Sequence, residues 1–429
     1  MKLDHKRTVL VGLAFLSICA FWQMYDNIIP LILTNTFHLD ETISGAIMAA
    51  DNVLALFLLP FFGALSDRTS TKIGRRMPFI LGGTAAAVIL MNLLPLFDNG
   101  YANGASTGKL AMFVVTLGLL LVAMGTYRSP AVALMPDVTP KPLRSKANAV
   151  INLMGSAGGI IVLALGMVFA TASVSNSMMS YTGYFGVIAA LMLAALVVFM
   201  LTVREPEWAR EMQAQSVAAG VENAEEAAHP NEGRKLSADE VKSLLLILLS
   251  IVLWFFGYNA VTSKYSVYAS NILHKDYNLT LIIAQAAAIA AYLPVGFIAG
   301  KIGRKKTILA GVVMLTVAFG VAGFLTADSP SALMNAMFAL AGIAWATINV
   351  NSFPMVVELA SGGDVGKYTG FYYTASMAAQ VATPMVSGLL MDKFGMHVLF
   401  PYAAVFTALA FVTMLFVKHG DSREVPKQT

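Results

Sequence analysis

The sequence is poor in charge. Asp, Glu, Lys and Arg make up 12% of its 429 residues, against roughly 25% in soluble domains. Hydrophobic residues make up 57%. This composition excludes a soluble enzyme, a nucleic-acid-binding protein and a disordered scaffold. The single cysteine, Cys19, cannot form a disulfide within the chain, so a disulfide-stapled secreted domain is excluded as well.

Metal-binding and catalytic motifs are also missing from the sequence. None of the six histidines lies deep in an apolar run or beside a second candidate ligand, so no metal site is expected. There is no phosphate-binding loop, Walker motif or nucleophile elbow, which argues against ATP-driven transport and against hydrolysis. We therefore predict that the chain is not an enzyme and holds no metal and no cofactor.

Long apolar runs take up most of the chain instead. At about 20 residues for each crossing, the length accommodates about twelve membrane helices. The runs are continuous and about twice as long as barrel strands, and an open sheet edge cannot be satisfied in lipid, so helices are expected. The predicted spans are 8–33, 43–66, 77–98, 110–136, 147–172, 181–203, 241–270, 279–300, 307–327, 332–358, 369–391 and 398–418.

Basic residues gather in alternate connections between these spans. The connections on the other side hold only Lys109, Lys275 and Lys393, so the positive-inside rule predicts that both termini are cytoplasmic. The net charge of +4 then reflects basic inner loops. The polar stretch between spans six and seven is predicted to be a linker. The predicted organisation is a six-helix bundle at 1–203, a cytoplasmic linker at 204–240, a second six-helix bundle at 241–418 and a cytoplasmic tail at 419–429.

The two halves of the chain echo one another. Gly74-Arg75-Arg76 follows span two, and Gly303-Arg304-Lys305 follows span eight. Asp137 closes span four as Glu358 closes span ten, and each acid stands nine residues before a lysine. These echoes in register predict two parallel six-helix repeats, which are typical of a large class of secondary transporters.

The longest motif joins spans two and three. The run from Gly63 to Phe79, with Ser-Asp-Arg before Ile-Gly-Arg-Arg-x-Pro-Phe-Ile, resembles the loop between helices two and three of the major facilitator superfamily. Its longer spacing is similar to that of the plant sucrose–proton symporters and their animal and bacterial relatives. Ala133-Leu-Met-Pro-Asp137 resembles the end of helix four in the same group. That group carries an arginine on helix four where this chain has Val132; Arg128 lies one turn earlier on the same face.

The resemblance implies a fold, a mechanism and a cavity. The fold is an all-α membrane protein of twelve transmembrane helices in two pseudo-symmetric six-helix bundles. The mechanism is alternating access, with helices one, four, seven and ten lining the cavity. The gating motif that we assign comprises Gly63, Asp67, Arg68, Gly74, Arg75, Arg76 and Asp137.

Four ionisable side chains lie well inside the spans, away from their ends: Asp26, Asp51, Arg128 and Lys264. A charge at the bilayer centre costs about 3 kcal/mol on insertion scales, so each is expected to face a cavity or a partner. One reading is a structural ion pair or a charge that reaches the membrane surface. The other, which we adopt, is proton coupling by these four residues, with Asp26 or Asp51 carrying the proton.

Polar and aromatic side chains cluster on several spans. Sugars need this mixture, because aromatic faces cover C–H groups while amides and carboxylates bind hydroxyls. The alternative is that amides hold helices together and that aromatics lie at the membrane interface. The predicted substrate-binding residues are Trp22, Gln23, Asp26, Asn27, Arg128, Asn152, Tyr258, Asn259, Asn349 and Tyr373.

These observations and the resemblance together predict a cation-coupled symporter, with H⁺ favoured over Na⁺, for a di- or oligosaccharide glucoside. We expect a monomer in a bacterial cytoplasmic membrane, with the lipid bilayer, a sugar and the coupling cation as partners and no nucleic acid. The alternative function is efflux of a drug or small solute by proton antiport. Such antiporters carry a Gly-Pro-rich pattern in helix five, and the run 155–159 lacks the proline.

Overall fold

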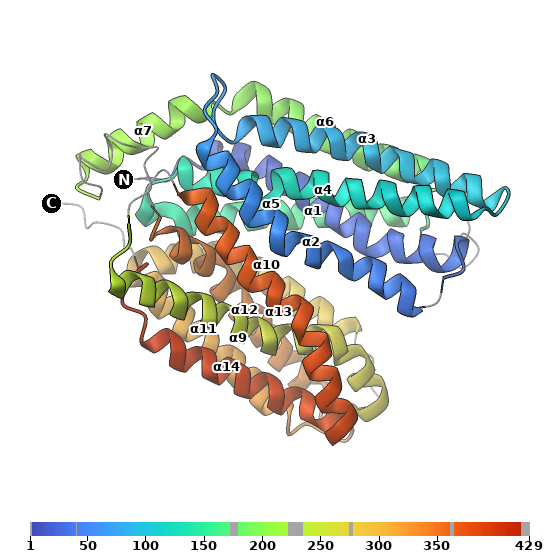
Figure 1. The fold of residues 1–429 in the computed structure, drawn as a ribbon. Coiled ribbons are helices and arrows are strands. Elements are labelled where there is room, and N and C mark those ends of the chain that lie inside the picture. The colour runs from blue at the N-terminus through green and yellow to red at the C-terminus, as the bar shows by residue number, and fades with distance from the viewer. Residues whose placement is uncertain are drawn as a thin grey trace. The chain divides into compact units, whose positions relative to one another are not determined.

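Helices are the regular structure throughout the part of the chain that the computed structural model describes, residues 2–39, 41–171, 179–221, 235–273, 278–360 and 364–421 (Figure 1). No strand occurs in these ranges. Twelve long helices match the twelve predicted spans, and one shorter helix, α7, follows the sixth. The bounds are α1 (His5–Leu31), α2 (Glu41–Arg68), α3 (Met77–Ala102), α4 (Thr107–Asp137), α5 (Arg144–Val168), α6 (Thr182–Thr202), α7 (Glu205–Ala218), α9 (Ala238–Tyr268), α10 (Asn278–Ile302), α11 (Arg304–Ala322), α12 (Ser331–Val357), α13 (Val365–Phe394) and α14 (Leu399–Leu415).

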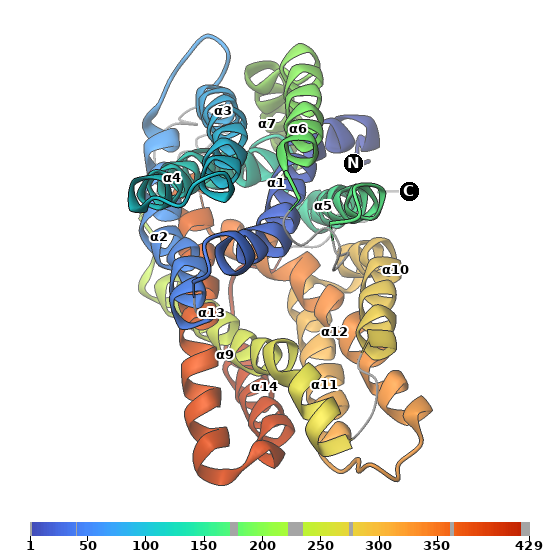
Figure 2. The ribbon, with the colours of Figure 1, turned by 90° about the vertical axis from the view of Figure 1, so that its right-hand side faces the viewer.

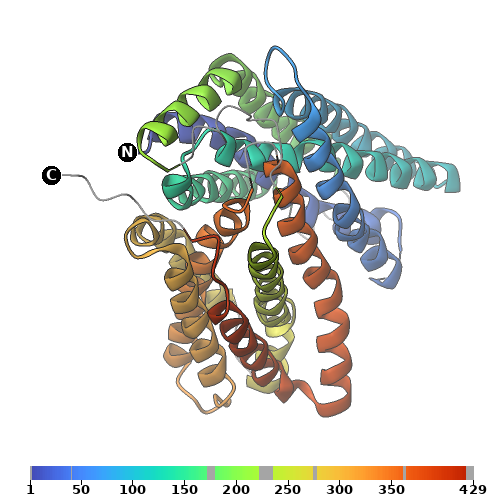
Figure 3. The same cartoon turned by 60° about the vertical axis from the view of Figure 1, so that its left-hand side comes forward.

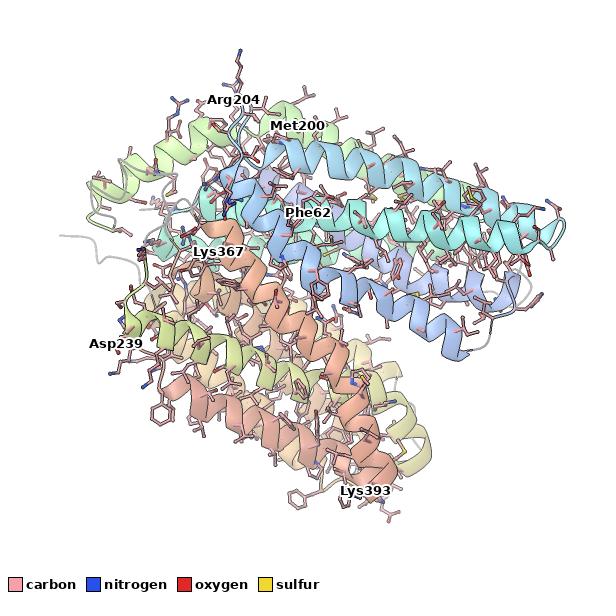
Figure 4. All side chains as sticks on the ribbon, in the orientation of Figure 1. Phe62, Met200, Arg204, Asp239, Lys367 and Lys393 are labelled. Atoms are coloured by element: carbon pink, nitrogen blue, oxygen red, sulfur yellow. The ribbon has the colours of Figure 1, made fainter. Side chains whose placement is uncertain are left out.

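Eleven of the described helices are long and apolar enough to cross a membrane by length and composition. The twelfth predicted span lies on α13, which has 30 residues and therefore exceeds the roughly 20 residues that a crossing needs. It carries more small and hydroxyl side chains than the others. In Figure 4, Lys367 lies near one end of α13 and Lys393 near the other. The basic side chains thus flank the helix, as expected of a helix that crosses a bilayer.

Helices α1 to α6 pack in a recurring set of pairs. Helix α3 packs against α4 and α6, α2 packs against α4, and α1 packs against α6 (Figure 2). Glycine brings α1 and α5 close together, because a Cβ at Gly158 would collide with the carbonyl oxygen of Leu16. Such small-residue contacts let membrane helices approach backbone to backbone.

Helices α9 to α14 use the corresponding pairs. Helix α11 packs against α12 and α14, α10 against α12, and α9 against α14. Helix α9 also packs against α13, and Figure 3 shows α9 between α13 and α14. Each pair in the second set corresponds to a pair in the first, shifted by six membrane helices. This confirms the prediction of two related six-helix repeats.

The chain divides into two compact units. One contains residues 4–138 and 150–211, and the other contains residues 1–3, 139–149 and 212–429. The division therefore passes through α5 and α7. Helix α7 lies inside the predicted linker 204–240, and its buried side chains Trp208, Met212 and Ser216 recur at helical spacing. The rest of that linker, residues 222–234, lies outside the described residues.

Candidate functional site

Helix α1 presents the aromatic and polar face that the sequence predicts. Trp22 and Gln23 are half-buried, and Asp26 and Asn27 are exposed. The guanidinium of Arg128, on α4, lies 5.2 Å from the centroid of the Trp22 ring. This cation–π contact places the base of α4 against the aromatic face of α1.

A small pocket opens beside this contact. It is lined by Trp22, Asp51, Leu54, Ala55, Leu58, Leu59, Leu121, Gly125 and Arg128. The indole Nε1 of Trp22 and the Oδ1 of Asp51 are buried without a hydrogen-bond partner in the described chain. One donor and one acceptor therefore stand ready for a ligand, because buried polar atoms are normally paired.

The two acids of this region act electrostatically on one another and on Arg128. The charges of Asp26 and Asp51 interact, and each also interacts with Arg128. Three of the four ionisable residues predicted inside spans are thus brought together. Lys264 is half-buried on α9 in the other unit, and Asn152, on α5, is half-buried in the same unit as Arg128.

The second repeat holds an aromatic and amide cluster of its own. Tyr258 of α9 stacks on Trp345 of α12, with ring centroids 3.8 Å apart and planes at 5°. The Oδ1 of Asn349 accepts a hydrogen bond of 3.4 Å from the hydroxyl of Tyr372. Tyr373 lies edge-on to Tyr372 at 5.5 Å. Three predicted binding residues therefore belong to a cluster with two further aromatics.

The remaining predicted residue of this repeat is Asn259 on α9. It is half-buried, and its Nδ2 is buried without a hydrogen-bond partner in the described chain. It therefore offers a donor that no protein group uses among the described residues.

The predicted gating motif forms a buried network around Arg76, whose side chain is 0% exposed. Its Nε donates to Asp137 at 2.8 Å and its Nη2 to Asp67 at 2.6 Å. It also donates to the hydroxyl of Ser66 and, at 3.5 Å, to the carbonyl of Gly63. Burial alone would lower the pKa of Arg76, but Asp137 and Asp67 raise it above its ordinary value, so the guanidinium stays charged.

The two other arginines of the motif differ. Arg75 donates to the second oxygen of Asp137 at 2.7 Å, so that carboxylate holds two guanidinium groups. Arg68 ends α2 with an exposed side chain. The structure therefore brings Arg75 into the network, while Arg68 lies on the surface.

Glu205, at the start of α7, completes this network and was not among the predicted residues. Its carboxylate accepts from the backbone N–H groups of Arg75, Arg76 and Met77 at 3.0 to 3.2 Å. Met77 is the first residue of α3 and Arg76 is its N-cap, and N–H groups at a helix start lack partners within the helix. Gly74 has φ +123°, and a Cβ there would collide with the Glu205 carboxylate. Glycine is required at this position for both reasons.

The second repeat builds the same network from different residues. Arg304, 1% exposed, donates to Glu358 at 2.6 Å, as Arg76 does to Asp137. Asp421 accepts from the backbone N–H of Arg304 at 2.6 Å, as Glu205 does in the first repeat. Arg304 also donates to the hydroxyl of Ser145 at 3.0 Å and to the carbonyl of Lys141.

One buried acid departs from the sequence analysis, which placed Asp98 at the very end of span three. Helix α3 continues four residues further, to Ala102, and Asp98 is 2% exposed. Asp26 and Asp51 are therefore not alone as acids within the helices.

Comparison with known proteins places this geometry in a family. The model of the Major Facilitator Superfamily matches residues 11–291 and 265–429. A sucrose transport protein of Arabidopsis thaliana, SUC3, is 32% identical over 145 residues, or 30% of this chain and 24% of the relative. The Escherichia coli (strain K12) protein YagG, whose name describes a glycoside/cation symporter, is 26% identical over 180 residues, or 42% of this chain and 38% of the relative. The matches thus span well under half the length of these curated relatives.

The fold is also that of solved transporters. The structure of the proton:xylose symporter XylE bound to 6-bromo-6-deoxy-D-glucose superimposes with a TM-score of 0.70. The match covers 97% of this chain and 95% of that chain at 15% identity, a level that shows the fold alone. A family model matched over nearly the whole chain, two six-helix repeats and paired arginine–carboxylate networks agree with one another. The chain is a multi-pass integral membrane transporter of the major facilitator superfamily.

Proposed function

We propose that the chain is a proton-coupled symporter of a di- or oligosaccharide glucoside. The observation that carries the proposal is the pocket beside Trp22, where an indole N–H and a carboxylate oxygen of Asp51 both lack hydrogen-bond partners in the described chain. A sugar hydroxyl can accept from the one and donate to the other. The similarity to SUC3 and YagG supports a glycoside as the ligand.

The second repeat supplies complementary groups for a sugar. Trp345 is half-buried and already stacked by Tyr258, so the pair forms one rigid aromatic platform. Asn349 and Tyr372 provide an amide and a hydroxyl joined to one another. In our proposal these groups form a second candidate sugar-binding surface, which lies within the second repeat. Alternating access by rocking of the two repeats would then expose the ligand to either side.

Coupling is proposed to run through Asp51 and Asp26. Among the side chains that line the pocket, Asp51 is the carboxylic acid and Arg128 is the base. A buried carboxylate is costly unless a base or a proton neutralises it. In our proposal Arg128 neutralises one acid at a time, and the other acid carries the proton. Na⁺ is the alternative coupling cation, because the same two carboxylates could bind it.

The gating motif is proposed to act on the cytoplasmic side of a bacterial inner membrane, with both termini in the cytoplasm. The distribution of basic residues supports this orientation. Arg76 and Arg304 then lie at corresponding cytoplasmic ends of the two repeats. We further propose that the transporter works as a monomer, because the bonds of Arg76 and Arg304 described above all end on residues of the same chain.

Uptake into proteoliposomes tests this function. Labelled sucrose and maltose are offered with and without an inward proton gradient, and with a sodium gradient in a parallel series. Gradient-stimulated uptake of either sugar is expected in the native protein, and Asp51→Asn should abolish the stimulation while keeping sugar exchange. Asn92→Ala is the matched control, because the Asn92 amide donates to a carbonyl of its own helix, that of Val88 at 2.7 Å.

Uptake of neither sugar under any gradient would overturn the disaccharide assignment. Antiport of an amphipathic solute is then the alternative, and the apolar wall formed by Leu54, Leu58 and Leu121 is the feature that favours it. The same vesicles, loaded at low internal pH and offered a fluorescent cationic dye, measure that activity directly.

A further inference from the structure

Helix α12 lacks one of its backbone hydrogen bonds, at the carbonyl of Val350. Within an α-helix each N–H bonds the carbonyl four residues earlier. Pro354 lies inside α12 and has no N–H, so the carbonyl of Val350 loses its intrahelical donor. Val350 is 0% exposed, so water is excluded from this carbonyl, and a buried carbonyl without a partner is costly.

Asn148 of α5 fills this gap. Its Nδ2 donates to the carbonyl of Val350 at 2.9 Å and to that of Asn349 at 3.2 Å. The side chain is 6% exposed. One amide group thus reaches from α5 to the two backbone carbonyls that stand one turn before the proline.

At the start of α5, Arg144 also donates to the carbonyl of Val357 on α12 at 3.1 Å, but the side chains next to Asn148 are small and apolar. Next to Asn148, Ala149 packs in a cluster with Ala288, Tyr292 and Val350. Gly296 is so close that a Cβ there would stand 2.8 Å from the Cβ of Ala149. Small apolar side chains of this kind let the helices approach closely, but they do not prevent one helix from shifting along the other. The bonds of Asn148 are directional and fix one register of α5 on α12.

The course of α5 shows why this register matters. Residues 139–149 belong to the compact unit that contains α9 to α14, and α5 from Val150 onward belongs to the other unit. Both partners of the Asn148 bond therefore lie in one compact unit, and a rearrangement of α5 during alternating access would act on its contact with α12.

We propose that Asn148 is a positioning residue that latches the start of α5 to α12 by completing the hydrogen bonding broken at Pro354. The inference rests on the proposed transport cycle for its functional meaning. When the latch forms, the carbonyl of Val350 is satisfied. When α5 separates from α12, the carbonyl of Val350 loses this hydrogen bond and needs water as a partner. The missing N–H of Pro354 therefore favours the conformation in which Asn148 is bonded to α12.

Maleimide labelling tests the latch without any substrate. The full-length protein carries Cys19→Ser, which removes its one native cysteine, and Ala149→Cys as reporter. Ala149 is 1% exposed, so a water-soluble maleimide reaches the reporter only when α5 lifts. Asn148→Ala is expected to raise the labelling rate about tenfold, which corresponds to about 1.4 kcal/mol. Asn92→Ala, which removes an amide bond within one helix, should leave the rate unchanged.

Pro354→Ala supplies the decisive comparison. Alanine restores the N–H at residue 354, so α12 can satisfy Val350 by itself. In this background, Asn148→Ala should change the labelling rate less than twofold. An equal increase in both backgrounds would show that Asn148 acts by something other than the carbonyl gap, and that result would overturn the proposal.

A second variant keeps the test sharp if Pro354→Ala does not fold. Asn148→Asp preserves the size of the side chain but removes the N–H donor at pH 8. We expect it to label as fast as Asn148→Ala, whereas a rate equal to that of the native residue would refute the latch. Because labelling needs no sugar, a failure of sugar uptake and a failure of the latch are separate results.

Discussion

Glu205 is expected to be one of the most stabilising single side chains outside the membrane helices. Its carboxylate binds three backbone N–H groups at the start of α3 at 3.0 to 3.2 Å. Taking about 1 kcal/mol for each lost bond, Glu205→Ala should cost about 3 kcal/mol. At about 2–4 °C for each kcal/mol in domains of 150–250 residues, the midpoint of thermal unfolding should fall by roughly 6–12 °C.

The assay is thermal unfolding of the purified protein in detergent, followed by intrinsic fluorescence. Glu207→Ala is the matched control, because Glu207 lies on the same turn of α7 but makes an exposed ion pair with Arg204 at 3.4 Å. Surface pairs contribute about 0–1 kcal/mol, so this variant should melt within about 4 °C of the native protein. Equal losses from the two variants would refute the capping argument.

Gly74 offers an internal check of the same reasoning. Gly74→Ala introduces strain at φ +123° and a collision with the Glu205 carboxylate. Removing Glu205 relieves the collision but not the backbone strain. The double variant should therefore lose less stability than the sum of the single variants, by about 1 kcal/mol or more. Strict additivity would show that the two residues do not touch in solution.

Three further outcomes follow from the contacts. Arg76→Lys should lower the unfolding midpoint by several degrees in the same assay, because an ammonium cannot reproduce the fork that holds Asp137 and would cost about 2–4 kcal/mol. Trp22→Phe keeps an aromatic ring but loses the indole N–H, and should weaken sugar affinity about fivefold, measured as the KM of uptake. Tyr258→Ala removes the stacking partner of Trp345 and should raise KM about three- to tenfold, whereas Tyr258→Phe should stay within about twofold.

The fold was largely predictable from the sequence because each crossing requires a long apolar run. Every predicted span lies on one long helix, and the repeat was visible in Gly74-Arg75-Arg76 and Gly303-Arg304-Lys305. What hydropathy could not supply was the extent of the helices. Helix α3 continues four residues beyond the predicted end of its span at Asp98, and it buries that acid because neighbouring helices cover it. Helix α7 lies in a stretch predicted to be a linker that is partly helical at most, and its polar composition did not indicate its bounds.

The site was predictable only where its residues share a helix or a motif. Trp22 and Arg128 were found because an intramembrane charge or aromatic cluster is conspicuous in itself. Their meeting at 5.2 Å depends on how α1 packs against α4. Glu205 was missed because it lies 130 residues from Arg75 in the chain. No sequence spacing indicates this contact. The signal that could have pointed to it was Gly74, because a glycine just before a helix permits another group to approach the backbone closely.

The two repeats have similar arginine motifs, but the hydrogen bonds of Arg76 and Arg304 connect different elements. Each hydrogen bond of the Arg76 side chain in the described chain ends on α2 or α4, inside one unit. Arg304, which aligns with Arg75 in the sequence repeat but is buried like Arg76, binds Glu358 of its own repeat and also Ser145 at the start of α5. Arg76 therefore rigidifies one bundle, while Arg304 fastens α11 and α12 to the segment that joins α4 to α5. We expect loss of Arg76 mainly to lower the free energy of unfolding. Loss of Arg304 should mainly shift the equilibrium between the conformations of the transporter. In the labelling assay, Arg304→Gln should expose the reporter at residue 149 more than Arg76→Gln does. The reverse order would show that sequence symmetry is the better guide to function.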